Sequence, residues 1–69
     1  MNKDILKGQW RELKGQVKRK WGKLTDDNVD RIDGSYEELL GMLQKHYGYS
    51  REEAEREVEN FRPEPTRTP

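Results

Sequence analysis

Residues 6–24 read LKGQWRELKGQVKRKWGKL, and apolar side chains recur along them at spacings of 4, 3, 4, 4 and 3 residues. At 100° per residue these side chains fall within an arc of about 80°, which predicts an apolar stripe along one face of a helix. The stripe consists of Leu6, Trp10, Leu13, Val17, Trp21 and Leu24. We therefore expect a first helix over 3–21. Gly8 and Gly15 are candidate breaks in it, because glycine weakens a helix interior.

Three shorter helices are expected to follow. Thr25 is a good N-cap, and Ser35 and Ser50 each have a Glu three residues later, which is the pattern of a capping box. Strand patterning is nearly absent. The sequence thus predicts an all-α domain of four helices over 3–21, 26–33, 35–47 and 51–61, packed as a small orthogonal bundle or as two helical hairpins.

The apolar positions of the four helices predict one core. Its expected members are Leu6, Trp10, Leu13, Val17, Trp21, Leu24, Val29, Ile32, Tyr36, Leu39, Leu43, Tyr47, Ala54, Val58 and Phe61. Residues 8–22 and 34–48 share the frame Gly-x-aromatic-x-x-Leu-x-Gly-x-aliphatic-x-x-x-aromatic-Gly. This weak repeat, offset by 26 residues, indicates an ancestral duplication of one hairpin.

Length and composition limit what the chain can be. It has 69 residues, of which 29% are hydrophobic and 41% charged, so there is room for one small domain, expected over 1–62. Residues 63–69 are rich in proline and are expected to be a disordered tail. No apolar run is long enough for a transmembrane helix or a signal peptide. The absence of cysteine excludes disulfides and thiolate zinc sites and suits a cytoplasmic protein.

Charge is unevenly distributed along the chain. Residues 1–23 carry eight basic and two acidic side chains, a net charge of +6, and residues 24–69 carry six basic and twelve acidic ones, a net charge of −6. A chain polarised in this way can associate with itself or present its basic half to an anion. The pI of about 6.6 argues against a dedicated nucleic-acid binder, for which a pI above ~9 is typical.

Beside the apolar stripe lies a second arc of about 80° that is occupied by cations. This basic stripe consists of Lys3, Lys7, Arg11, Lys14 and Lys18. It is a candidate site for nucleic acid, for which affinity falls as salt rises, or for an anionic membrane surface. The alternative is a solvated face whose lysine stems cover apolar neighbours. Trp10 and Trp21 could stack on bases, but so few apolar residues are present that both are expected in the core.

The sequence offers little support for catalysis or metal binding. His46 is the single histidine and has no second ligand at helical spacing, so we expect it to be hydrogen-bonded or solvated. Asp26, Asp27, Asp30 and Asp33 lack the spacing of a calcium loop, and helix capping explains Asp26 and Asp27 better. We expect no enzyme, no metal, no cofactor and no small-molecule substrate.

Three segments resemble one known family, the CsbD-like proteins, which are small bacterial general stress-response proteins. The segments are KGQWRELKGQVK (7–18), KWGKLTDD (20–27), and YGY (47–49) followed by EAE (53–55). The resemblance implies an all-helical cytoplasmic protein, abundant under stress, with no established molecular activity and hence no catalytic residues to transfer. Ser35, Tyr36, Met42 and His46 stand where the family pattern has basic residues, which argues against anion binding in the second half.

Three hypotheses about function follow. The favoured one is a non-catalytic, protective stress-response protein, as the resemblance implies. The second is a nucleic-acid-binding module that uses the basic stripe. The third is a module for self-association or protein interaction, in which the +6 segment of one chain meets the −6 segment of another.

Overall fold

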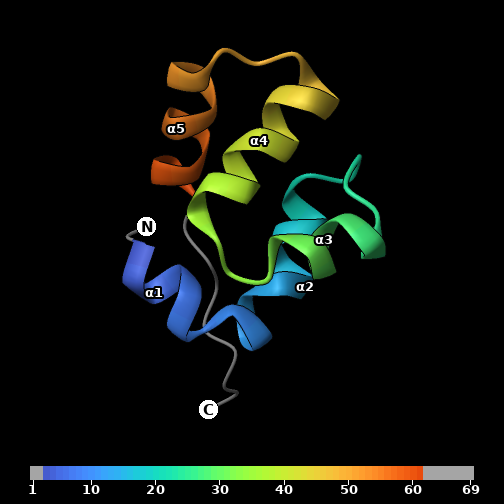
Figure 1. Ribbon diagram of the computed structural model, residues 1–69, viewed down its shortest axis with the longest axis vertical. Helices are drawn as coiled ribbons and strands as arrows, with labels where there is room; N and C mark the ends of the chain where they lie inside the picture. Colours follow the sequence, from blue (N-terminus) through green and yellow to red (C-terminus); the bar gives the residue numbers. More distant parts are fainter. Residues whose placement is uncertain (1–2, 62–69) are drawn as a thin grey trace.

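The first apolar stripe forms two helices instead of one (Figure 1). The computed structural model describes residues 3–61. Within them, α1 (Lys3–Gly8) and α2 (Trp10–Lys20) are separated by Gln9, whose φ of −116° and ψ of 21° are not helical. The expectation of a single helix over 3–21 is therefore wrong. Of the two candidate breaks, the one at Gly8 is confirmed, while Gly15 lies inside α2.

A turn from a distant part of the chain packs against this bend. Backbone hydrogen bonds are kept on both sides of the bend. The Gln9 amide donates to the Ile5 carbonyl at 2.9 Å, and the Leu13 amide donates to the Gln9 carbonyl at 2.9 Å. Gly34 lies against the bend, with a φ of +82°. A Cβ at that position would come within 3.1 Å of the Lys7 Cα. The bend and the glycine thus let two backbones approach closely.

The other three helices begin and end within a residue of the expected positions. They are α3 (Asp26–Ile32), α4 (Tyr36–Tyr47) and α5 (Arg51–Asn60). The capping box at Ser50 is confirmed, and Thr25 forms a second one with Asn28, which the sequence analysis did not predict. At Ser35 the structure shows one of the two hydrogen bonds of a capping box, in which the Ser35 hydroxyl accepts from the Glu38 amide at 3.3 Å.

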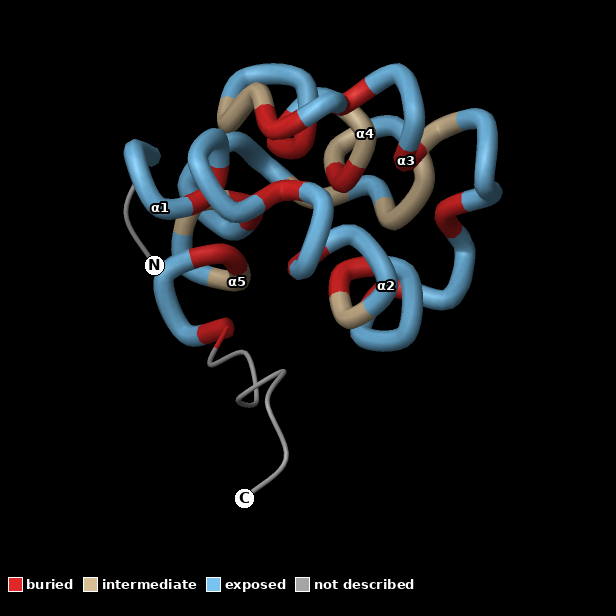
Figure 2. The backbone as a smooth tube through the Cα atoms, turned by 90° about the horizontal axis from the view of Figure 1, so that it is seen from below, coloured by how far each residue is buried: buried red, intermediate tan, exposed pale blue. Residues whose placement is uncertain are grey.

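The core is almost the one expected. Thirteen of the fifteen predicted residues are buried, and the two exceptions, Tyr36 and Tyr47, are packed against the core but only partly buried. Their hydroxyl groups favour a position at the surface. Leu40 was not predicted, yet it is fully buried. The reason is that α4 packs against α1, α3 and α5, so more than one face of α4 is covered (Figure 2).

The described part of the chain is all-helical, with five helices and no strand. Helices that follow one another in the chain pack together, and α1 also contacts α4. The arrangement as two hairpins, the duplication and the domain limit at residue 62 stay predictions. The expected tail over 63–69 lies outside the described residues.

Candidate anion-binding face

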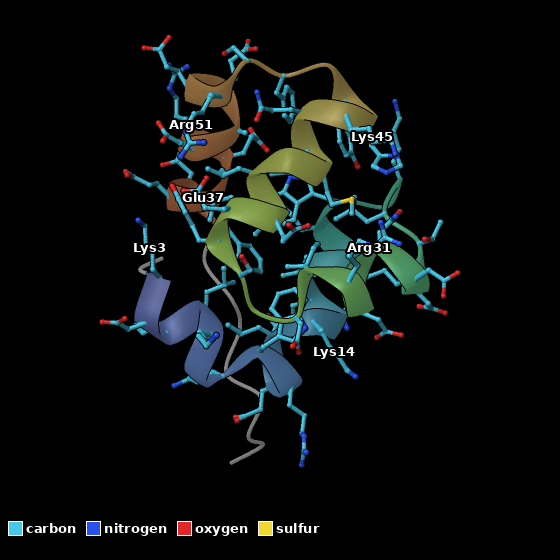
Figure 3. All side chains as sticks on the ribbon, in the orientation of Figure 1. Lys3, Lys14, Arg31, Glu37, Lys45 and Arg51 are labelled. Carbon is cyan, nitrogen blue, oxygen red and sulfur yellow. The ribbon has the colours of Figure 1, made fainter. Side chains whose placement is uncertain are left out.

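The bend at Gln9 divides the basic stripe between two helices. Lys3 and Lys7 belong to α1, whereas Arg11, Lys14 and Lys18 belong to α2. All five side chains are exposed. Figure 3 shows Lys3 at the start of α1 well apart from Lys14 on α2. The stripe is therefore not one straight row of positive charge.

Carboxylates from α3 line the same grooves as the cations of α2. Lys7, Arg11 and Lys14 share a shallow groove with Asp30 and Asp33. The adjoining groove places Lys14 and Lys18 beside Asp30 and Asp26. Lys18 also forms an ion pair with Asp26. We call these three cations, Lys18 and the three aspartates the mixed-charge seam.

The α1 end of the stripe also meets an acidic residue. Lys3 and Lys7 line a third groove together with Tyr36 and Glu37 of α4. The Lys3 amino group lies 5.3 Å from the centre of the Tyr36 ring, which is cation–π distance. Every cation of the basic stripe thus shares a groove with at least one carboxylate. These partners were not predicted, although the spacing of Asp26 and Asp30 puts both on one face of α3 and Asp33 follows at its C-cap.

Lys23, near the end of the basic segment, is engaged in packing. Its backbone amide donates to the Tyr47 hydroxyl at 3.2 Å, and its amino group lies 5.0 Å from the centre of the Tyr47 ring. The Tyr49 ring stacks on Tyr47 with centroids 5.4 Å apart. Desolvation, and after it the charge of Glu57, raises the pKa of Tyr49. These contacts attach the loop after α2 to the end of α4.

The two tryptophans are core residues, as expected. Trp10 is 7% exposed and Trp21 is 2% exposed. The Trp21 ring packs on Phe61 with centroids 5.3 Å apart, and its Nε1 donates to Glu57 Oε1 at 3.4 Å. Neither indole offers a free face for stacking on a base or for anchoring in a membrane surface.

His46 differs from the expectation that it would be solvated or hydrogen-bonded. Its Nε2 atom is buried and has no hydrogen-bond partner among residues 3–61. No group of three or more acidic, histidine or cysteine side chains there could hold a metal ion. These residues therefore offer no metal centre.

Across the same residues, no helix has the length and apolarity needed to cross a membrane.

The strongest ionic contacts join α4 to α5. The Arg51 guanidinium donates to both carboxylate oxygens of Glu37, at 3.0 and 2.9 Å, and to Glu55 at 3.3 Å. The hydrogen bond from Arg51 lowers the pKa of Glu37 below its ordinary value of 4.5, and the positive charges of Arg51 and Lys3 act in the same direction. Bidentate pairing of this kind is the most specific form of arginine–carboxylate contact.

This contact predicts a pH-dependent contribution to stability. Because the pKa of Glu37 is lower in the folded chain, its contribution is complete above pH 4.5 and is lost as the pH falls through the folded-state pKa. We expect Glu37→Gln to lower the urea midpoint at about pH 7 and to lower it progressively less as the pH falls below 4.5. Glu38→Gln is the matched control, since Glu38 is also in the first turn of α4 but has no Arg51 contact. Equal pH profiles for the two variants would contradict the role of Arg51.

Comparison with known proteins places these observations in a family. A family model described as CsbD-like matches residues 4–56. A UPF0337 protein of Protochlamydia amoebophila is 54% identical over 61 residues, which cover 88% of this chain and 92% of that protein. A UPF0337 protein of Pseudomonas aeruginosa is 51% identical, with coverages of 88% and 94%. The UPF0337 protein YjbJ of Escherichia coli K12 is 50% identical over 58 residues, covering 84% of each chain. No solved structure matches.

Proposed function

Since the chain belongs to the CsbD-like family, we propose that it is a non-catalytic stress-response protein that acts by protecting other macromolecules in the bacterial cytoplasm. The family resemblance supplies the physiological setting. The names of the relatives assign no reaction to them. The mechanism must therefore be argued from this chain's own surface.

The observation that carries the proposal is the distribution of charge over the folded surface. Charged residues make up 41% of the chain, yet the formal net charge is zero. Among the described residues, no charged or polar residue is buried. The cations of the basic stripe share their grooves with carboxylates. Such a surface is strongly hydrated and has no large field of one sign. It favours many weak contacts over one tight site.

The positions of the carboxylates and of His46 support a non-catalytic role. Most carboxylates of the described residues lie at helix starts, in surface ion pairs or in open grooves, and Glu57 accepts a hydrogen bond from Trp21. A general acid–base pair needs a positioned donor and acceptor on either side of one substrate atom. His46 has its Nε2 without a partner, and no nucleophile is hydrogen-bonded to it among residues 3–61.

A client-protection assay tests the proposal. A heat-labile enzyme is heated, or dried and rehydrated, with increasing amounts of the full chain, and its aggregation and residual activity are measured. We expect aggregation to fall as more chain is added. A hydrated, highly charged surface that contacts the heated enzyme only weakly keeps the partly unfolded enzyme molecules apart. An unrelated small protein at equal mass is the control. Protection no better than that of the control would contradict the proposal.

Self-association stays a second candidate, on the specific observation that the net charges of residues 1–23 and 24–69 are equal and opposite. Sedimentation at about 50 and about 200 mM salt measures it, because association through exposed charges weakens within this range. A monomer under both conditions would remove this candidate.

A further inference from the structure

Two helical faces of opposite sign oppose each other in the mixed-charge seam. On α3, Asp26 and Asp30 follow the spacing i, i+4, so their side chains fall within about 40° of one another, and Asp33 is the C-cap residue that follows the helix. On α2, Arg11, Lys14 and Lys18 follow the spacing i, i+3, i+7. Two adjoining grooves bring the two rows together, and the Lys18–Asp26 ion pair joins them at one end.

These contacts contribute little to the stability of the fold. The Lys18 and Asp26 side chains are 46% and 82% exposed, and ion pairs this exposed are worth at most about 1 kcal/mol. Lys7, Arg11 and Lys14 form no ion pair among residues 3–61 and yet face aspartates in the groove. The carboxylates are therefore placed where they change the potential around the cations more than they hold the helices together.

We propose that α3 acts as an intramolecular competitor of nucleic acid: Asp26, Asp30 and Asp33 lie against the basic row of α2 and keep phosphate groups away from it. Each carboxylate repels an approaching phosphate and supplies the negative charge that would otherwise come from a bound counterion. Removing the carboxylates would leave Lys7, Arg11, Lys14 and Lys18 as an exposed basic row. The partner of that row would be the phosphate backbone of a nucleic acid.

The surface favours nucleic acid over an anionic membrane. A peripheral membrane helix needs apolar or aromatic side chains beside its cations. Here Trp10 and Trp21 are buried, and among the described residues Ile5 is the one large hydrophobic side chain that is exposed. A phosphate backbone requires only the cations.

The test compares two variants of equal net charge in the full-length chain. The seam variant carries Asp26→Asn, Asp30→Asn and Asp33→Asn. The control carries Glu38→Gln, Glu52→Gln and Glu59→Gln, which are exposed on α4 and α5. Each has a net charge of +3, because three acidic charges are removed from a neutral chain. Binding of a fluorescein-labelled single-stranded DNA is measured by anisotropy at about 50 and about 200 mM salt.

We expect the seam variant to bind the DNA at least roughly tenfold more tightly than either the wild type or the control at the lower salt, and to lose this gain at the higher salt. Adding Lys7→Gln, Arg11→Gln and Lys14→Gln to the seam variant is expected to abolish the gain. An equal gain in the control would overturn the proposal, because net charge alone would explain it. No gain in the seam variant would overturn it as well.

Two further measurements keep the outcome interpretable. Asp30→Asn with Asp33→Asn leaves the capping box at Thr25 intact, and at the C-cap of α3 Asn tolerates the left-handed φ of 46°. This double variant, checked by circular dichroism, must show part of the gain. Vesicles of phosphatidylcholine and phosphatidylserine are titrated in parallel, and a gain for vesicles without one for DNA overturns the choice of partner. The assay contains no client protein, so its failure is separate from that of the protective role.

Discussion

Trp21→Ala is expected to leave most of the chain unfolded at 25 °C. Removing a buried tryptophan costs about 3–5 kcal/mol, and a domain of this size without disulfides or metals is stable by no more than about 3–5 kcal/mol. Trp21 is 2% exposed and packs on Phe61, so its removal leaves a cavity between the end of α2 and the end of α5. Far-ultraviolet circular dichroism and urea titration measure the loss of helix.

Trp21→Phe is the matched control for this prediction. It keeps an aromatic ring against Phe61 but removes the hydrogen bond from Nε1 to Glu57, which is long at 3.4 Å and partly exposed. We expect this variant to stay folded with a lower urea midpoint, having lost about 1–2 kcal/mol. If Trp21→Ala kept the wild-type midpoint, the indole would not be a core residue, and base stacking would again be its best explanation.

The sequence predicts most of the fold because the deciding signals are local. Helical periodicity places Trp21 and its neighbours in the core, and the caps Thr25 and Ser50 fix where α3 and α5 begin. Leu40 was missed because its burial depends on how many helices surround α4, and no property of its own helix reveals that number.

The candidate site was predicted less completely for the same reason. The basic stripe follows from the spacing of its cations within one segment. The aspartates that face it belong to another segment, and a helical spacing cannot say which helix will pack opposite. The sequence analysis interpreted Asp26 as a helix-capping residue, which α3 supports, but its pairing with Lys18 appears only in the folded chain.

The bend at Gln9 depends on a contact of the same long-range kind. In the repeat, Gly8 and Gly34 occupy equivalent positions. In the structure the surroundings of the two glycines differ. A Cβ at position 8 would have no neighbour within 4 Å, whereas one at position 34 would lie 3.1 Å from the Lys7 Cα and 3.2 Å from the Trp10 Cβ.

Gly34→Ala is therefore expected to lower the free energy of unfolding by about 2–4 kcal/mol, through left-handed backbone strain and the clash with α1 together. Because the clash is with backbone, α1 and the bend must move away from the turn after α3, and a side-chain rotation cannot relieve it. Urea titration followed by circular dichroism measures the loss. Gly15→Ala, inside α2 with open space around its Cβ position, is the opposing control and should gain about 0.5–1 kcal/mol. Equal losses in Gly34→Ala and Gly8→Ala would show that the two glycines are as equivalent in the fold as they are in the repeat, and that the close approach at the bend does not shape α1 and α2.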